Sequence, residues 1–287
     1  MPDKQTVLKR LHAKAAAGIP IIGTGAGTGL TGKAEAEGGA DLIIAYATGS
    51  FRMAGRSSLA GRFAASNANA AVLRMVDELI PLVGDTPVLS GVFVQDPFCN
   101  PDHLLTQLEK SGCAGVQNIP GMGGQAIMEG ETVVRQLDAV GAGFDAEVDF
   151  VRMASRRGFL TTPYCSQPAH IEKMAKAGAD IFVLHMGLTG RAEDKTMAVT
   201  PLEECAEKIR HLAEIAVALR PDALVLAHGG PIIDPSDLAQ LMQRCQHLHG
   251  FYGASSIERI PVEEQVIGGV RQYKSLTLSQ QQRSYEV

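Results

Sequence analysis

Two histidines stand at matching places in the sequence, each at the end of a short apolar run. His185 ends the segment DIFVLH, and His228 ends the segment ALVLAH. Near neutral pH an imidazole can take up a proton, release one or polarise a carbonyl group. Histidines also bind metals, although two of them without a clear third protein ligand are a weak metal signature. We therefore predict that His185 and His228 are catalytic and transfer protons.

A third candidate catalytic residue is Asp96, in the stretch VQDPF at the end of another apolar run. Its carboxylate could bind Mg²⁺, which takes few protein ligands and keeps several waters, or act as a general base. An aspartate directly before Pro97 could instead cap a turn, and these readings stay open. Mg²⁺ is the only cofactor that we consider, with Asp96 as its ligand.

Residues suited to binding an anion follow the last two apolar runs, in AHGGPI and GFYGASSIER. We predict that the backbone N–H groups of Gly229 and Gly230 and the hydroxyl groups of Ser255 and Ser256 bind substrate. A carboxylate would fit there nearly as well as a phosphate. Arg52, in GSFRMAGRSS, could clamp such an anion because a guanidinium matches its geometry, or it could be a solvated loop residue.

Other apolar runs also end in polar residues, whereas their beginnings and middles are Ile, Val, Leu, Ala and Phe. Contact with solvent would explain one polar end, but the asymmetry recurs along the chain. We therefore predict that these ends complete the substrate-binding surface, with Thr24, Gly25, Asn118, Thr162 and Tyr164.

The stretch IIGTGAGTGLTG, residues 21–32, contains the GxGxxG pattern of dinucleotide-binding folds. Such folds also need a helix that starts directly at the glycines and an acidic residue at the end of the next strand. Here the next strand ends in AYATGS, and TGKAEAEGG offers a helix of only about two turns. We expect no nucleotide cofactor. The glycines either let backbone N–H groups approach another ligand or form a turn that binds nothing.

Eight short apolar runs alternate with helical patterns. We predict strands at residues 20–24, 41–47, 87–95, 114–118, 159–164, 180–185, 223–228 and 250–255. Such strands pair in parallel through right-handed crossovers, and eight units in roughly 250 residues indicate an α/β fold, the (β/α)8 TIM barrel. The carboxyl ends of all barrel strands meet at one mouth, so the polar strand ends would become neighbours.

No linker or break in composition divides the chain, and we predict a single domain, residues 1–287, with the barrel core at about 19–275. The N-terminal residues indicate an amphipathic helix rather than a secretory signal. The connection at residues 120–143 is long enough to suggest a lid over the mouth. The polar tail, residues 279–287, is expected to fray or to contact another subunit.

Composition narrows the classes of function. The net charge of −5 leaves no basic surplus for general nucleic-acid binding. The sequence contains no run of about 18 apolar residues, which is the length needed to span a membrane. The five cysteines are far apart and form no CxxC pair, which indicates free thiols in a reducing compartment. We expect a cytoplasmic protein that binds neither nucleic acid nor membrane.

Several blocks of the sequence resemble the phosphoenolpyruvate hydrolase-like family, also called the TIM-barrel signal-transduction protein family. They include GTGAGTGLTGKAEAEGGADLI, GFLTTPY, AHGGPI and GFYGASSIERIPVE. The resemblance places the chain among the phosphoenolpyruvate mutase and isocitrate lyase-like barrels. It implies a homo-oligomer that acts on a small carboxylate or phosphorylated carboxylate. Mutase-type members hold Mg²⁺ beside acids after strands three and four, where this chain has Asp96 and Asn118.

Two functions follow from these residues and from the resemblance. One is a hydrolase or a lyase/phosphonomutase-like enzyme acting on a phosphoenolpyruvate-like or oxo-acid substrate, with His185 and His228 moving protons and Asp96 orienting water or Mg²⁺. The other is a barrel that senses a ligand or binds a protein without turnover. Substrate turnover would separate the two.

Overall fold

The computed structural model describes residues 3–58, 67–119, 121, 132–190 and 199–278. Within these residues every strand pairing is parallel, and a single sheet runs in the order β5-β4-β3-β2-β1-β9-β8-β7-β6. The strands are β1 (Ile21–Ala26), β2 (Leu42–Ala45), β3 (Val88–Gly91), β4 (Gly115–Gln117), β5 (Leu160–Thr161), β6 (Tyr164–Cys165), β7 (Ile181–His185), β8 (Leu224–His228) and β9 (Gly250–Gly253).

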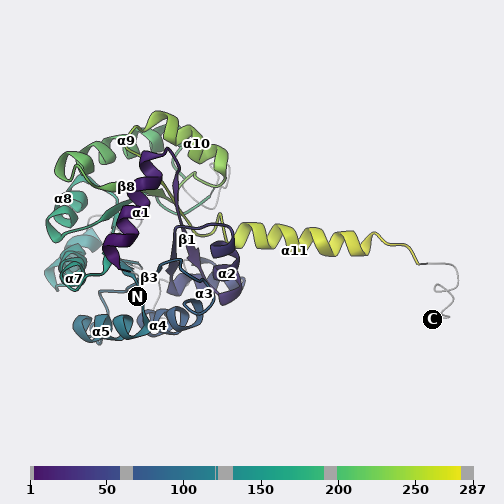
Figure 1. Cartoon of the computed structure of the whole chain (residues 1–287), viewed down its shortest axis with the longest axis horizontal. Coiled ribbons are helices and arrows are strands. Elements are labelled where there is room, and N and C mark those ends of the chain that lie inside the picture. Colours follow the sequence, from purple (N-terminus) through teal and green to yellow (C-terminus); the bar gives the residue numbers. More distant parts are fainter. Residues whose placement is uncertain (1–2, 59–66, 120, 122–131, 191–198, 279–287) are drawn as a thin grey trace.

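The two ends of this strand order belong to one stretch of chain, and this closes the sheet into a barrel. β5 pairs with β4, and β6 pairs with β7. Between them, Thr162 donates its N–H to the Val116 carbonyl (3.1 Å), and the Pro163 carbonyl accepts from Val183 (3.0 Å). The strand predicted at 159–164 is therefore two short segments that meet at a proline, which lacks a ladder donor. The predicted eight-unit TIM barrel is confirmed, with helices forming a ring around the strands (Figure 1).

Helices follow the strands as the alternating pattern predicts. α5 begins after the N-cap Asn100, whose side chain accepts from the His103 N–H, and ends at Gly112 with φ +84°. α8 likewise ends at a left-handed glycine, Gly178. The ring helices are α2 (Gly29–Glu37), α3 (Ala47–Met53), α4 (Ala68–Leu79), α5 (Pro101–Ser111), α7 (Phe144–Arg156), α8 (Pro168–Ala177), α9 (Leu202–Leu219) and α10 (Pro235–Arg244).

The predicted N-terminal helix, α1 (Lys4–Ala16), closes the amino-terminal end of the barrel. Its buried side chains Val7 and Leu11 belong to the apolar cluster that fills the barrel interior. Lys4 pairs with Asp180 at 2.8 Å, next to the start of β7, and so ties the helix to that end of the sheet. The strands finish at the opposite end of the barrel, where β7 and β8 end in His185 and His228.

Two glycines of β1 make room for tyrosine rings inside the barrel. A Cβ atom on Gly23 would lie 2.6 Å from the Tyr252 ring, and one on Gly25 would lie 2.7 Å from the Tyr46 ring. Real Cβ contacts are never that short, so the large rings require glycine opposite them. The first glycines of the glycine-rich stretch thus serve the packing of the barrel interior.

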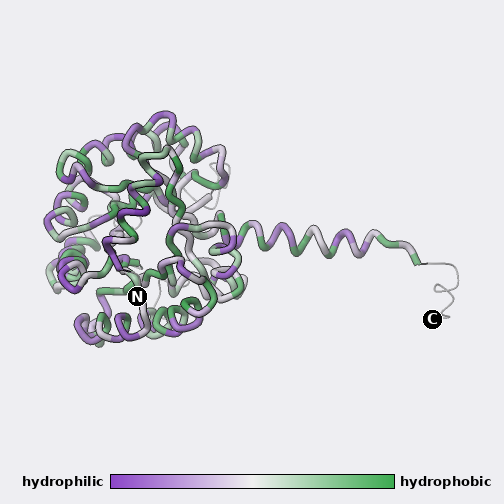
Figure 2. Tube along the Cα trace, viewed as in Figure 1, coloured by the Kyte–Doolittle hydropathy of each residue, from purple (hydrophilic) through white to green (hydrophobic). Residues whose placement is uncertain are grey.

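The last helix, α11 (Arg259–Lys274), differs from the ring helices because it projects away from the barrel (Figure 1). None of its residues is buried. Apolar side chains along it are exposed, including Val266 at 61% and Val270 at 57%, and Figure 2 shows hydrophobic and hydrophilic residues alternating along the projecting segment. None of the described helices has the length and apolar character needed to cross a membrane. The tail 279–287 and residues 120 and 122–131 of the predicted lid lie outside the described residues.

Candidate active site at the carboxyl end of the barrel

A small cavity of about 60 Å³ opens where β7 and β8 end. His185 and His228 are the last residues of these strands and pair in register, with ring centroids 5.1 Å apart. The structure therefore brings the two predicted catalytic histidines together. The other side chains around the cavity come from α3 and the residues beside it, from β6, and from the segments that follow β4, β7 and β9. They are Tyr46, Thr48, Arg52, Ser58, Ile119, Tyr164, Leu188, Thr189, Ala254 and Ser255.

The two histidines have opposite hydrogen-bonding partners at Nδ1. His185 Nδ1 accepts the N–H of Gly187 at 3.0 Å, so the proton of a neutral His185 is on Nε2. His228 Nδ1 lies 2.7 Å from the carbonyl oxygen of Tyr252, which can only accept, so a neutral His228 carries its proton on Nδ1 and its lone pair on Nε2. At Nε2, therefore, His185 is a donor and His228 is an acceptor. This pair can supply one acid and one base to a bound molecule.

A chain of buried hydroxyl groups lies beside the histidines. The Tyr164 ring is 4.9 Å from His185 and 4.8 Å from His228, and its hydroxyl is 3.0 Å from that of Tyr46. Tyr46 donates to the side-chain oxygen of Gln117, whose amide nitrogen donates to the Thr162 carbonyl at 2.8 Å. Since Tyr46 donates to Gln117, its oxygen accepts from Tyr164. Burial raises the pKa of Tyr46 well above its ordinary value, which keeps this donor protonated.

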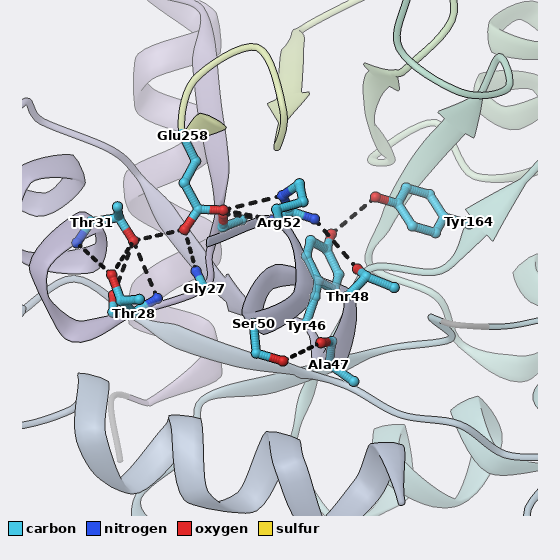
Figure 3. A network of polar contacts seen from close by, with 11 residues as sticks. Gly27, Thr28, Thr31, Tyr46, Ala47, Thr48, Ser50, Arg52, Tyr164 and Glu258 are labelled. Atoms are coloured by element: carbon cyan, nitrogen blue, oxygen red, sulfur yellow. Dashed lines mark hydrogen bonds and ion pairs between the residues drawn. The ribbon is translucent and has the colours of Figure 1, made fainter. Parts of the chain in front are cut away.

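Arg52, which was predicted to clamp an anion, lines the cavity but is also held by a carboxylate (Figure 3). Its Nε and Nη2 atoms donate to Glu258 Oε2 at 3.2 and 2.9 Å, and both side chains are at most 3% exposed. Nη2 also donates to the Gly25 carbonyl, and Nη1 lies 3.4 Å from Thr48 Oγ1. One edge of the guanidinium thus faces Glu258, and Nη1 faces the cavity side chain Thr48.

The same carboxylate answers the question of what the glycine-rich stretch binds. Glu258 Oε1 accepts the N–H of Gly27 and the hydroxyl of Thr31 (2.7 Å), near the start of α2 (Figure 3). At the first turn of the same helix, Glu78 accepts the N–H of Gly29 at 2.6 Å. Amides that hold phosphate in nucleotide-binding folds here hold the chain's own carboxylates. α2 does begin at the glycines, contrary to the sequence argument, but β2 still ends without an acid.

Asp96 is the predicted catalytic residue that the structure does not bring to the histidines. β3 was expected to reach residue 95 but ends at Gly91, so Asp96 lies in the loop beyond the barrel mouth. Its Oδ1 accepts the N–H of Phe98 at 3.0 Å, which is the turn-capping alternative. It lines a different surface pocket, together with Asn69, Cys99 and His103.

Other predicted substrate-binding residues lie near the mouth without lining this cavity. Asn118 bonds the Tyr164 N–H (2.7 Å) and the Glu147 carboxylate. Gly230 donates its N–H to the Gly187 carbonyl at 3.2 Å, where the loops after β7 and β8 meet. Thr24, Gly25, Thr162, Gly229 and Ser256 are likewise outside the cavity lining, whereas Tyr164, Arg52 and Ser255 are part of it.

Sequence reasoning missed three residues of this region. Tyr46 ends the apolar run LIIAY as plainly as the histidines end theirs, so its position was a usable signal. Glu258 stands next to Arg259 in the sequence, but it pairs with Arg52, and Arg259 pairs with Glu263 at 2.7 Å. Glu147 lies in the first turn of α7, but it is fully buried and accepts from Gln95 and Asn118. No sequence pattern indicates such pairings between distant segments.

The fold and the site together define a TIM-barrel protein with a small polar site at the carboxyl ends of its strands. More specifically, the chain belongs to the phosphoenolpyruvate hydrolase-like family, whose sequence profile matches residues 6–276. This confirms the family resemblance found in the sequence.

Two similar relatives are tomato (Solanum lycopersicum) proteins. The chain is 44% identical over 278 residues to the ToMV resistance protein Tm-1(GCR237) and 45% identical over 272 residues to the ToMV susceptible protein tm-1(GCR26). The alignments cover 97% and 95% of this chain but 36% of each relative. The chain therefore spans about a third of the length of these curated relatives.

Similar solved structures include a 2,3-dimethylmalate lyase, which is named as a member of the PEP mutase/isocitrate lyase superfamily, and a phosphonopyruvate hydrolase. The 2,3-dimethylmalate lyase has a TM-score of 0.59 and 14% identity, over 96% of this chain and 86% of that one. Phosphonopyruvate hydrolase, solved with oxalate and Mg²⁺, has a TM-score of 0.57 and 13% identity, over 93% and 88%. At such identities the likeness establishes the fold.

Because one neighbour holds Mg²⁺, we tested whether the donors after β3 and β4 fit this ion. Gln95 donates to Glu147 Oε1 at 2.7 Å, and Asn118 donates to the other Glu147 oxygen. The Asn118 amide cannot be turned around, because its oxygen accepts the Tyr164 N–H. Among the described residues no three His, Cys, Asp or Glu side chains gather into a metal site. Amide donors aimed at the carboxylate do not fit a cation.

Proposed function

We propose that this chain is an enzyme acting on a small oxo or phosphorylated carboxylate, with hydrolase or lyase/phosphonomutase-like chemistry. The observation that carries the proposal is the pair of histidines with opposite tautomers beside one cavity. A general base and a general acid within reach of the same molecule are what proton transfer next to a carbonyl group requires.

In this proposal the substrate carboxylate lies against Arg52 Nη1, Thr48 and Ser255, which all line the cavity. His228 Nε2 takes a proton from water or from the carbon next to the carbonyl group. His185 Nε2–H donates to the oxygen on which negative charge develops. No step passes through a metal ion. Oxalate, which is named as ligand or product in two structural neighbours, is a suitable probe.

The test has two arms. Turnover of phosphoenolpyruvate, oxaloacetate and related oxo acids is measured with added Mg²⁺ and with a chelator. In parallel, NMR follows exchange of the pyruvate methyl protons in D₂O, which reports proton abstraction even if the natural substrate is untried. We expect exchange that persists with the chelator. If the protein neither exchanges these protons nor turns over any acid, the enzyme proposal fails.

The alternative is a barrel that binds a ligand or a protein without turnover. It is favoured by the pairing of Arg52 with Glu258, which neutralises the cavity's cation, and by the naming of the 44% identical relative as a virus resistance protein. Calorimetry separates the two: oxalate binding without any proton exchange or turnover supports this alternative.

Assembly belongs to the same proposal, because α11 exposes apolar side chains that its own barrel leaves uncovered. Ile267 is 49% exposed and Tyr273 is 79% exposed, in addition to Val266 and Val270. These positions recur every three or four residues, as on a helix face that packs against a partner. A second copy of the chain offers the same stripe, and closed pairs of identical subunits are the commonest assembly. The proposed state is a homo-oligomer joined through α11.

A further inference from the structure

Glu258 is a buried carboxylate that the proton-transfer scheme does not use. It is the last residue before α11, and its side chain is fully buried. The hydrogen bonds of its side chain to the described residues reach segments more than 200 residues away in sequence: Gly27 and Thr31 on one oxygen, and Arg52 on the other. A buried carboxylate would be costly without these donors.

The geometry points to Glu258 as a positioning residue that aims Arg52 at the anion in the cavity. This inference rests on the proposed function, because it assumes that Arg52 contacts the substrate carboxylate. Glu258 takes the Nε and Nη2 edge of the guanidinium and leaves Nη1 on the side of Thr48, which lines the cavity. A guanidinium has a rigid planar fork, so fixing one edge fixes the direction of the other donors.

The glycine-rich stretch has a part in this arrangement. Gly27 and Thr31 hold Glu258 Oε1, so the carboxylate cannot rotate away when Arg52 is drawn toward a ligand. A Cβ atom on Gly27 would lie 2.3 Å from the Gly49 carbonyl oxygen, so only glycine fits this close approach of β1 to α3. In this inference the glycine-rich loop holds Glu258, Glu258 orients Arg52, and Arg52 contacts the anion.

A purely structural role for Glu258 predicts something different. In that case its loss would lower stability and would affect ligand binding equally whether or not Arg52 is present. A double-mutant cycle separates the two roles, because coupling appears only if one residue acts through the other.

The experiment measures oxalate binding by calorimetry for the wild type, Glu258→Gln, Arg52→Met and the double variant. We expect Glu258→Gln to raise the oxalate dissociation constant about tenfold or more, as loss of a fixed charge-assisted contact does. In the Arg52→Met background, Glu258→Gln should change the oxalate dissociation constant less than about twofold. The matched control is Glu263→Gln, which removes an exposed carboxylate from α11 and should leave oxalate binding unchanged.

A second variant covers the case in which Glu258→Gln does not fold. Thr31→Val removes the hydroxyl that donates to Glu258 and lies in α2, outside the cavity lining. It should weaken oxalate binding a few-fold, again only when Arg52 is present. Equal effects of these substitutions with and without Arg52 would overturn the inference and leave the proposed function standing. If the wild type binds no oxalate and exchanges no pyruvate protons, both fall.

Discussion

At the scale of single residues, the same sequence pattern gives two histidines with opposite roles. Each ends an apolar strand, but His185 runs into a turn whose Gly187 N–H points back at its ring, whereas His228 lies beside the Tyr252 carbonyl of β9. The tautomers are therefore set by backbone groups around each ring. That both histidines would meet could be predicted from strand order, but the division into donor and acceptor could not.

We expect His228→Asn to lower pyruvate proton exchange, or turnover of the substrate found, by roughly 10²- to 10⁴-fold. Asparagine can still donate to the Tyr252 carbonyl from the position of Nδ1, but it has no atom in place of the base at Nε2. Oxalate affinity should change by only a few-fold. NMR exchange rates and calorimetry are the measurements. His211→Asn, on the exposed face of α9, is the control, and an unchanged rate in His228→Asn would remove His228 from the mechanism.

At the scale of elements, β1 and α2 combine packing with support of the site. The glycines of β1 admit two tyrosine rings into the barrel, and the loop after it binds Glu258. The glycine-rich stretch therefore serves packing and binds carboxylates of the chain itself.

Gly25→Ala should destabilise the protein by about 1–3 kcal/mol, because the new methyl group would displace the Tyr46 ring. Urea unfolding followed by circular dichroism measures the change. The control is Gly269→Ala in α11, where a Cβ atom meets nothing within 4 Å. There alanine should be neutral or stabilising by up to about 1 kcal/mol. Equal effects at both positions would contradict the packing role of Gly25.

Glu35, on the buried face of α2, makes stability depend on pH. Both of its carboxylate oxygens are buried without a hydrogen-bond partner among the described residues, and burial raises its pKa from 4.5 to about 7. A pKa raised by folding means that the folded state holds the proton more tightly. The protonated Glu35 side chain therefore makes its full contribution to the free energy of unfolding below pH 4.5, and this contribution is lost as the pH rises through 7.

We compare the free energy of unfolding of Glu35→Gln with that of the wild type. The difference should favour the variant more at pH 8 than at pH 4.5, by up to roughly 3 kcal/mol. Glutamine has a similar shape but does not ionise, so the difference between the two pH values isolates the ionisation of Glu35. Urea titrations of both proteins at the two pH values provide the measurement. Parallel pH profiles would show that Glu35 does not titrate between them.

Much of this architecture could be predicted from the sequence, because alternating apolar runs and caps such as Gly112 are local signals. The residues of the site were harder to predict when their position depends on the exact end of a strand. β3 ends four residues earlier than expected, and this moves Asp96 out of the mouth. Contacts between distant segments, such as Glu258 with Arg52, leave no local signal at all.

At the scale of the whole molecule, the barrel is a ring with one helix outside it. α11 leaves the barrel directly after Glu258, so this helix begins beside the residue that holds Arg52. The proposed assembly through α11 and the proposed binding of an anion in the cavity therefore have Glu258 in common.

We expect the wild type to sediment as an oligomer and Val266→Glu/Val270→Glu to sediment as a monomer at micromolar concentration. Two charges on the exposed apolar stripe would oppose its burial against another copy. Analytical ultracentrifugation gives the masses. Gln265→Glu adds a charge beside the stripe and should stay assembled. A monomeric wild type would contradict the proposed assembly.

The tyrosines inside the barrel give the protein an intrinsic spectroscopic signal. The chain has no tryptophan and five tyrosines, and Tyr46, Tyr164 and Tyr252 are buried together in the interior. Three of the five tyrosine rings that absorb in the near ultraviolet are therefore in the barrel interior, and two of them, Tyr46 and Tyr164, line the cavity. A molecule that enters the cavity should alter this signal without any attached dye.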